Sequence, residues 1–241
     1  MALRLYEKAS EPGARYFLDK TPRYSLVLDE LFETFPDARA IFLWRNPLAV
    51  VASIAETWFQ GRWAPYQHHV DLYAGLGGLV AARQRYAGRT VEVRYEDLVT
   101  QPTAALQSIL AYLDLGWDEA VVSDLRTARL DGPVGDQVGV HRYSAVSRES
   151  IDCWKTTLAA PVRKAWCRRY LDWVGDERLA VMGYDREVLR KELDALPNGS
   201  RRLLPDLWSS GRSAVCLAVE PAVVRSKLRG LRAPRAVHLH D

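Results

Sequence analysis

The chain has 241 residues, of which 48% are hydrophobic, and a formal net charge of +3. This length is enough for one domain with a real core, and the charge is too small to indicate a nucleic-acid-binding protein. Cys153, Cys167 and Cys216 lack the spacing of metal ligands and indicate a reducing compartment. No apolar run approaches the ~20 residues of a membrane-spanning helix, so we predict a cytoplasmic protein.

The first part of the chain predicts two strands with a helix between them. Residues 16–18 form a short strand, and residues 25–35 form a helix whose apolar stripe consists of Leu28, Leu31, Phe32 and Phe35. Residues 39–44 form the central strand. Because its apolar side chains are continuous and do not alternate, we expect this strand to be covered on both faces of a sheet.

The alternation of helix and strand continues through the middle of the chain. We expect a helix over 65–86 that is broken near a glycine cluster, and a strand over 90–94. The later pattern predicts a helix at 103–113, a loop at 131–143, two short helices split at Pro161 within 150–174, and a helix at 186–196. Such alternation predicts an α/β domain with a parallel central sheet.

The junction between the central strand and the following helix is the most informative part of the chain. Asn46 is a good N-cap, and Pro47 suits the first helical position. Arg45 ends the strand and Ser53 lies on the helix, so a guanidinium, free backbone N–H groups and a hydroxyl belong to one helix N-terminus. This combination predicts a phosphate site. Taken alone, the arginine and the serine also suit a purely structural role.

Two further segments accompany this junction, Lys20-Thr21-Pro22 upstream and Tyr95-Glu96-Asp97-Leu98 downstream. In this order and spacing, over about residues 15–185, the chain resembles the sulfotransferases that use 3′-phosphoadenosine 5′-phosphosulfate (PAPS). The bacterial, heparan-sulfate-type and tyrosylprotein-type branches are the most similar. The resemblance implies a three-layer α/β sandwich with a parallel central sheet, the P-loop-like sulfotransferase fold.

The resemblance also implies roles for particular side chains. Arg45 and Ser53 correspond to the residues that bind the 3′-phosphate of the nucleotide. Lys20 corresponds to the lysine near the transferring sulfuryl group, which makes it the candidate catalytic residue, and Tyr95 corresponds to a tyrosine near the nucleotide. Lys20 also fits a solvated surface lysine, and Tyr95 a half-buried residue at a strand end.

The family has a late loop that touches the 3′-phosphate, and its position points to Ser147 and Arg148, although the usual Arg-Lys-Gly form is absent. His68 and His69 lie where acceptors often bind in this fold, but adjacent histidines in a polar helix are more often simply exposed. PAPS is the implied co-substrate, 3′-phosphoadenosine 5′-phosphate (PAP) the implied product, and no metal is implied.

The family's first strand and its phosphate-binding loop, which cradle the 5′-phosphosulfate and precede the usual catalytic base, have no counterpart in the pattern. Nineteen residues precede Lys20, and the glycines at positions 75, 77 and 78 lack the Lys and Ser/Thr that hold phosphates. We therefore expect residues 1–196 to be a partial sulfotransferase domain, incomplete at its N-terminus. A mis-started gene, a fragment and one half of a split enzyme all fit this expectation.

The implied reaction moves a sulfuryl group from PAPS to a hydroxyl or amine of a small-molecule, carbohydrate or lipid acceptor. Two other interpretations stay open. One is a non-catalytic nucleotide-binding or partner subunit derived from a sulfotransferase. The other is a P-loop-like kinase fragment, which gives no reason for the segments at Lys20 and Tyr95 together. A homo-oligomer is compatible with every one of these interpretations.

Residues 197–241 are predicted to form a basic C-terminal tail, because residues 201–241 hold eight Arg or Lys side chains and three acidic ones. Within it, Leu203, Leu204, Leu207 and Trp208 recur at helical spacing. One interpretation is an amphipathic element that rests on an anionic membrane or on a partner surface. The other is a loosely ordered appendage.

Overall fold

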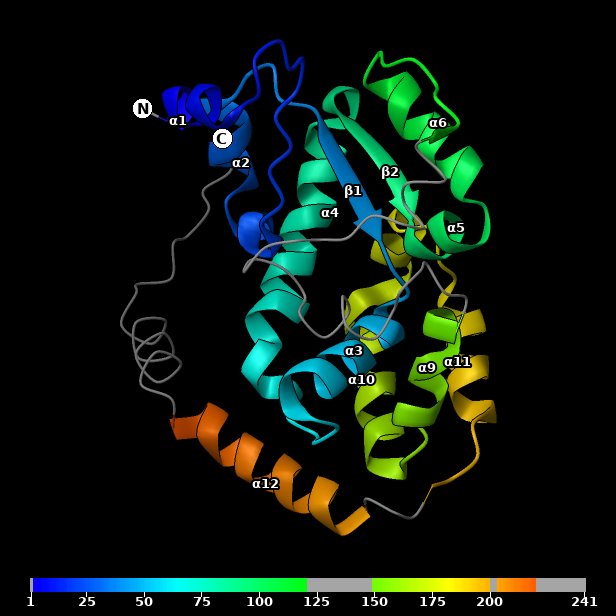
Figure 1. Ribbon diagram of the computed structural model, residues 1–241. Coiled ribbons are helices and arrows are strands. Elements are labelled where there is room, and N and C mark those ends of the chain that lie inside the picture. Colours follow the sequence, from blue (N-terminus) through cyan, green and yellow to red (C-terminus); the bar gives the residue numbers. More distant parts are fainter. Residues whose placement is uncertain (1, 121–148, 200–202, 220–241) are drawn as a thin grey trace, which may run out of the picture.

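A computed structural model describes residues 2–120, 149–199 and 203–219 of the chain (Figure 1). The sheet in this part of the chain has two parallel strands, β1 (Ala40–Trp44) and β2 (Thr90–Arg94). Both strands agree with the prediction. Their register aligns the two carboxyl ends, so Arg45 and Tyr95 follow the strands at the same edge of the sheet.

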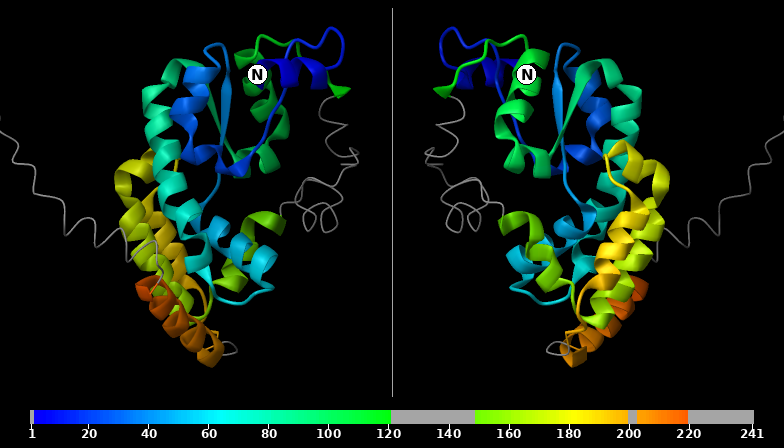
Figure 2. Two further views of the ribbon diagram at one scale, coloured as in Figure 1. Left: turned by 90° about the vertical axis from the view of Figure 1, so that its left-hand side faces the viewer. Right: turned by 90° about the vertical axis from the view of Figure 1, so that its right-hand side faces the viewer.

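Helices flank the strands on two sides, as Figure 2 shows. The helices α2 (Leu28–Thr34) and α4 (Leu76–Arg85) lie on one side, and α6 (Pro102–Tyr112) lies on the other. The short helix α5 (Tyr95–Thr100) connects β2 to α6. These layers confirm the predicted α/β architecture with a parallel sheet.

Beyond the carboxyl ends of the strands lies a group of packed helices (Figure 1). They are α3 (Pro47–Phe59), α9 (Glu149–Thr157), α10 (Pro161–Val181), α11 (Arg186–Ala195) and α12 (Leu203–Val219). The predicted break at Pro161 is confirmed, because this residue begins α10. Fully buried side chains from these helices, such as Leu171 and Val174 of α10, belong to the same hydrophobic core as the buried face of β1.

The remaining elements are short. They are α1 (Ala2–Ala9), the 3₁₀ helices η1 (Pro22–Leu26), η2 (Pro65–His68) and η4 (Ala87–Arg89), and the π-helix η3 (Val70–Gly75). The expected helix over 65–86 is thus divided into η2, η3 and α4. The change from π-helix to α-helix falls at Gly75, within the glycine cluster where a break was predicted.

The predicted strand at 16–18 is wrong. The segment has no regular secondary structure and pairs with no strand in the described part of the chain, because side chains fix it to the protein. Arg15 Nη1 donates a hydrogen bond to the carbonyl oxygen of Asp114 at 2.7 Å, and Tyr16 Oη donates one to Leu113 at 2.7 Å. Apolar residues at 17 and 18 therefore did not signal strand pairing.

The expectation that β1 is covered on both faces is also wrong for the described residues. Phe42 and Trp44 are buried, whereas Ile41 is 36% exposed and Leu43 is 55% exposed. Helix α6 lies on that side of the sheet, but in the described part of the chain it leaves Ile41 and Leu43 of β1 open to solvent. The continuous apolar run of β1 therefore forms a strand that is buried on one face and exposed on the other.

The region predicted as a tail begins with contacts to α10 and to the segment just before it. Lys164 Nζ donates to Asn198 Oδ1 at 3.1 Å, and the Gly199 N–H donates to the carbonyl oxygen of Ala159 at 3.2 Å. Helix α12 follows. Within the described ranges, no helix combines the length and the apolar character that crossing a membrane requires. The domain division at residue 196 stays a prediction.

Candidate functional site

The junction of β1 and α3 forms as the sequence predicts. Asn46 Oδ1 accepts a hydrogen bond from the Leu48 N–H at 2.9 Å, and Pro47 occupies the first turn of α3. This cap satisfies one backbone donor and leaves other N–H groups of the first turn directed out of the helix. The helix N-terminus therefore offers partial positive charge at the carboxyl edge of the sheet.

Arg45, Tyr95 and Ser150 converge at this edge. The Arg45 guanidinium lies over the Tyr95 ring, with 4.4 Å from Cζ to the ring centroid, and its Nη2 donates to the carbonyl oxygen of Ser150 at 3.1 Å. The Tyr95 hydroxyl lies 2.8 Å from Ser150 Oγ. Arg45 Nε is buried and has no hydrogen-bond partner among the described residues. A buried donor of this kind calls for an acceptor.

The other residues predicted to contact the nucleotide differ in their position. Ser53 lies on α3, is half-buried, and forms no side-chain hydrogen bond within the described part of the chain. Ser147 and Arg148 lie outside the described residues. Ser150, from the same sequence segment, is the residue that the structure brings to Arg45 and Tyr95.

Glu96 is a member of the site that the sequence did not single out. Its Oε1 accepts a hydrogen bond from the Asn46 N–H at 3.0 Å, and its Oε2 accepts one from the Tyr184 hydroxyl at 2.5 Å. Burial, and then this hydrogen bond, raise the pKa of Tyr184 above its ordinary range. Glu96 thus ties α5 to the backbone turn between β1 and α3 and acts as a positioning residue.

The segment that carries Lys20 is exposed but fixed on both sides. Before it, Asp19 accepts hydrogen bonds from Tyr6 Oη at 2.6 Å and Tyr24 Oη at 2.5 Å, and these hydrogen bonds lower the pKa of Asp19. After it, the Arg23 guanidinium donates two hydrogen bonds to Asp71, at 3.0 and 3.1 Å. Lys20 is therefore presented on a short segment with defined ends.

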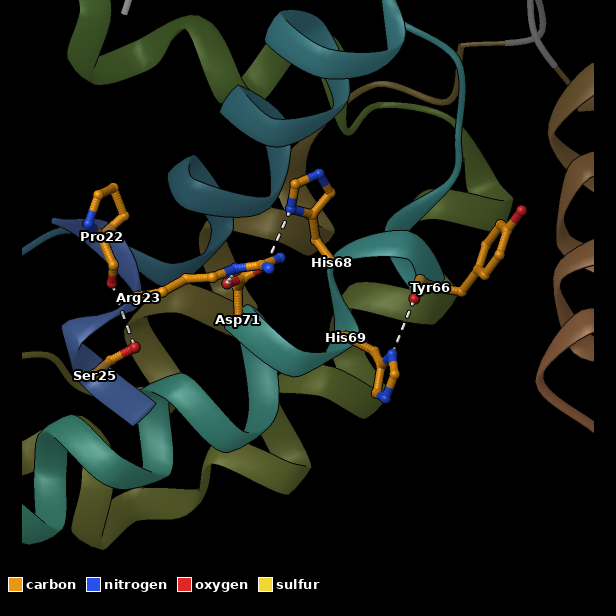
Figure 3. Close-up of polar contacts among 7 residues, drawn as sticks. All are labelled: Pro22, Arg23, Ser25, Tyr66, His68, His69 and Asp71. Carbon is orange, nitrogen blue, oxygen red and sulfur yellow. Dashed lines mark hydrogen bonds and ion pairs between the residues drawn. The ribbon is translucent and has the colours of Figure 1, made fainter. Parts of the chain in front are cut away.

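Figure 3 shows the polar contacts around Asp71. His68 Nδ1 lies 3.3 Å from Asp71 Oδ2, and the imidazole packs against the rings of Trp58 and Phe59. The neighbouring His69 Nδ1 lies 3.1 Å from the carbonyl oxygen of Tyr66. Both histidines are half-buried, so the interpretation that they are simply exposed does not describe them.

Two sequence comparisons relate the chain to known proteins. A family model described as "Sulfotransferase family" matches residues 1–119, a span that contains Lys20, Arg45, Ser53 and Tyr95. The nodulation protein NoeE of Sinorhizobium fredii (strain NBRC 101917 / NGR234) is 32% identical over 203 residues, which cover 73% of this chain and 46% of that protein. The chain thus spans about half the length of this curated relative.

Among solved structures, the sulfotransferase domain from the curacin biosynthetic pathway matches with a TM-score of 0.54. It is 21% identical in sequence, and the match covers 72% of this chain and 64% of that domain. At this identity the likeness concerns the fold alone, which is the α/β sulfotransferase fold. The family model and the relative support a sulfotransferase family for this chain, and the solved structure supports the fold.

Proposed function

We propose that the β1–α3 junction binds the 3′-phosphate of PAPS, and that the protein transfers the sulfuryl group to a hydroxyl or amine acceptor. The observation that carries this proposal is the Arg45 guanidinium, aligned over Tyr95 and with a buried Nε that lacks a partner in the described part of the chain. A planar guanidinium suits a dianionic phosphate because it can bind two of its oxygens. The first turn of α3 adds backbone N–H donors.

In this proposal the other side chains have distinct tasks. Ser53 offers its hydroxyl from α3, and Tyr95 holds the plane of the Arg45 guanidinium through its ring. Lys20 contributes to transfer. Sulfuryl transfer, like phosphoryl transfer, passes through a loose and highly charged transition state, so a compact cation near the bridging oxygen lowers the barrier. Lys20 is exposed and has no ion pair within the described ranges, which supports this role.

Calorimetric titration with PAP tests the phosphate site. Arg45→Ala removes a charge-assisted contact that usually contributes ~1.5–3 kcal/mol, so PAP affinity should fall at least about tenfold. Arg85→Ala is the matched control, because Arg85 is exposed at the C-terminal end of α4 and pairs with Asp29 of α2. Equal PAP affinity for wild type and Arg45→Ala would overturn the proposal.

A second experiment distinguishes nucleotide binding from sulfuryl transfer. Lys20→Ala should lower whatever PAP release from PAPS the wild type shows with a panel of hydroxyl and amine acceptors, and should leave PAP affinity within about twofold. An unchanged rate of PAP release would remove Lys20 from the transfer step. Turnover by wild type would also exclude the alternative of a non-catalytic nucleotide-binding subunit.

A further inference from the structure

One face of α12 carries four large apolar side chains that are open to solvent. Leu203 is 38% exposed, Leu204 77%, Leu207 51% and Trp208 78%. Their spacing puts them on the same side of the helix. Single exposed leucines are ordinary on a protein surface, but a contiguous apolar patch that includes a tryptophan marks an interaction surface. We name these four residues the α12 apolar face.

The opposite side of α12 is fixed to the rest of the protein. Asp206 and Arg163 are each 2% exposed, and they form a bidentate ion pair with N···O distances of 2.7 and 2.9 Å. Ser209 Oγ donates a hydrogen bond to the carbonyl oxygen of Trp63. Because Asp206 and Ser209 point inward, the rotation of the helix about its own axis is fixed, and the apolar face is directed away from the core. Figure 1 shows α12 along the border of the molecule opposite α1.

We propose that the α12 apolar face rests on an anionic lipid surface. The charge of this region supports that occupant. Asp206 is the one acidic residue in the sequence of α12, and it is buried against Arg163, so no carboxylate of the helix opposes lipid phosphates. Basic residues surround the helix in sequence, with Arg201 and Arg202 directly before it and five more from Arg212 to Arg232.

Leucine and tryptophan on one side of a helix, with arginines beside it, are typical of helices that lie in the plane of a membrane interface. Tryptophan prefers this depth because its ring is apolar and its N–H can contact water or headgroups. Each arginine near an anionic surface adds electrostatic attraction. The proposal therefore combines apolar burial with charge attraction, and it does not depend on the nucleotide site.

A second copy of the chain is the competing occupant. A two-fold contact through the same face would pair two copies of a helix whose own sequence and preceding residues carry arginines, without an available carboxylate of α12 to balance them. Lipid phosphates neutralise the same charges. For this reason the charge pattern favours a lipid surface over self-association.

The test is co-sedimentation of the full chain with phosphatidylcholine vesicles, with and without phosphatidylglycerol. We expect binding to the anionic vesicles at low salt, weaker binding at high salt because ions screen the attraction, and little binding to neutral vesicles. The double variant Leu204→Ser/Trp208→Ser removes apolar area that is already exposed. It should retain the thermal unfolding midpoint and lose vesicle affinity by roughly tenfold or more.

Trp58→Ser is the matched control, because it removes a tryptophan that is 68% exposed on α3 and should leave vesicle binding unchanged. Loss of binding in the double variant alone supports the proposal. Absence of binding to anionic vesicles at low salt overturns it, and so does binding that survives the double variant. Self-association that the double variant abolishes, without vesicle binding, would assign the face to a second copy instead.

Discussion

Asp71 connects the segment that carries Lys20 to the segment that carries His68. Hydrogen bonding from Arg23 is the largest cause that lowers the pKa of Asp71, and the contact with His68 lowers it further. A carboxyl group whose pKa is lower in the folded than in the unfolded state stabilises the fold above its unfolded pKa. This contribution is lost as the pH falls through the folded pKa.

We predict that Asp71→Asn lowers the thermal unfolding midpoint at neutral pH. The difference from wild type should narrow below about pH 4, where the wild-type carboxyl group also takes up a proton. Circular dichroism melts across this pH range check the prediction. Asp37→Asn is the control, since Asp37 is exposed and has no side-chain bond within the described ranges. A difference that is independent of pH would contradict the role given to Asp71.

Some residues of the site could be predicted from the sequence, and others could not. Arg45 and Tyr95 each follow a strand directly, and parallel strands end at one edge, so their proximity was predictable. Glu96 was not predictable as a positioning residue. Its two partners, Asn46 and Tyr184, are 50 and 88 residues away in sequence, and no spacing pattern relates them. Only the packing of α5 against the junction reveals this contact.

At the scale of elements, the glycine cluster has a different role from the one its sequence indicates. From sequence it marks an interruption of a helix. In the structure it is the surface on which η1 packs. A Cβ atom on Gly78 would lie 2.2 Å from the carbonyl oxygen of Ser25, and one on Gly75 would lie 3.0 Å from Ser25 Oγ. The absence of side chains there lets η1 approach α4, and η1 directly follows the Lys20 segment.

Two alanine substitutions one position apart test this contact. Gly78→Ala must displace the backbone of η1, and we expect it to destabilise the protein by ~1–3 kcal/mol. Gly77→Ala is the matched control, because its Cβ would meet nothing within 4 Å and alanine is the better helix former, by up to ~1 kcal/mol. Chemical denaturation should therefore give changes of opposite sign. Changes of the same sign and size would mean that the approach of η1 does not depend on Gly78.

The strand β1 shows why burial was harder to predict than secondary structure. The apolar run from Ala40 to Trp44 correctly predicts a strand, since local preference and hydrophobicity agree there. Which face is buried depends on the elements that pack against it. Phe42 and Trp44 enter the core, while Leu43 is 55% exposed because the helix on its side of the sheet, α6, does not cover it.

At the scale of the whole molecule, Arg163 joins segments that are far apart in sequence. Besides its ion pair with Asp206, its Nη1 donates to the carbonyl oxygen of Thr157 at 2.9 Å and its Nη2 donates to that of Gly61 at 2.8 Å. It also lies over the Trp63 ring, 5.2 Å from the centroid. One buried cation thus links the loop after α3, the end of α9 and α12. The sequence pattern gives no indication of this, because Asp206 belongs to the region predicted as a tail.

This arrangement predicts that replacing two aspartates, each paired with an arginine, lowers the free energy of unfolding by different amounts. Removing one partner of a buried ion pair leaves an uncompensated charge and typically costs ~3–5 kcal/mol, so Asp206→Asn should lower the free energy of unfolding by about 3 kcal/mol. Asp194→Asn breaks the exposed pair with Arg168 and should cost no more than about 1 kcal/mol.

The double variant Arg163→Met/Asp206→Leu replaces the buried pair by apolar side chains and should recover most of the loss, because neither charge is then left without a partner. Urea denaturation of the single and double variants measures all three values. If Asp206→Asn and Asp194→Asn cost the same, α12 is not fixed to α10 in solution as the structure describes. The orientation of the α12 apolar face would then lose its physical basis, since the buried ion pair is what directs that face outward.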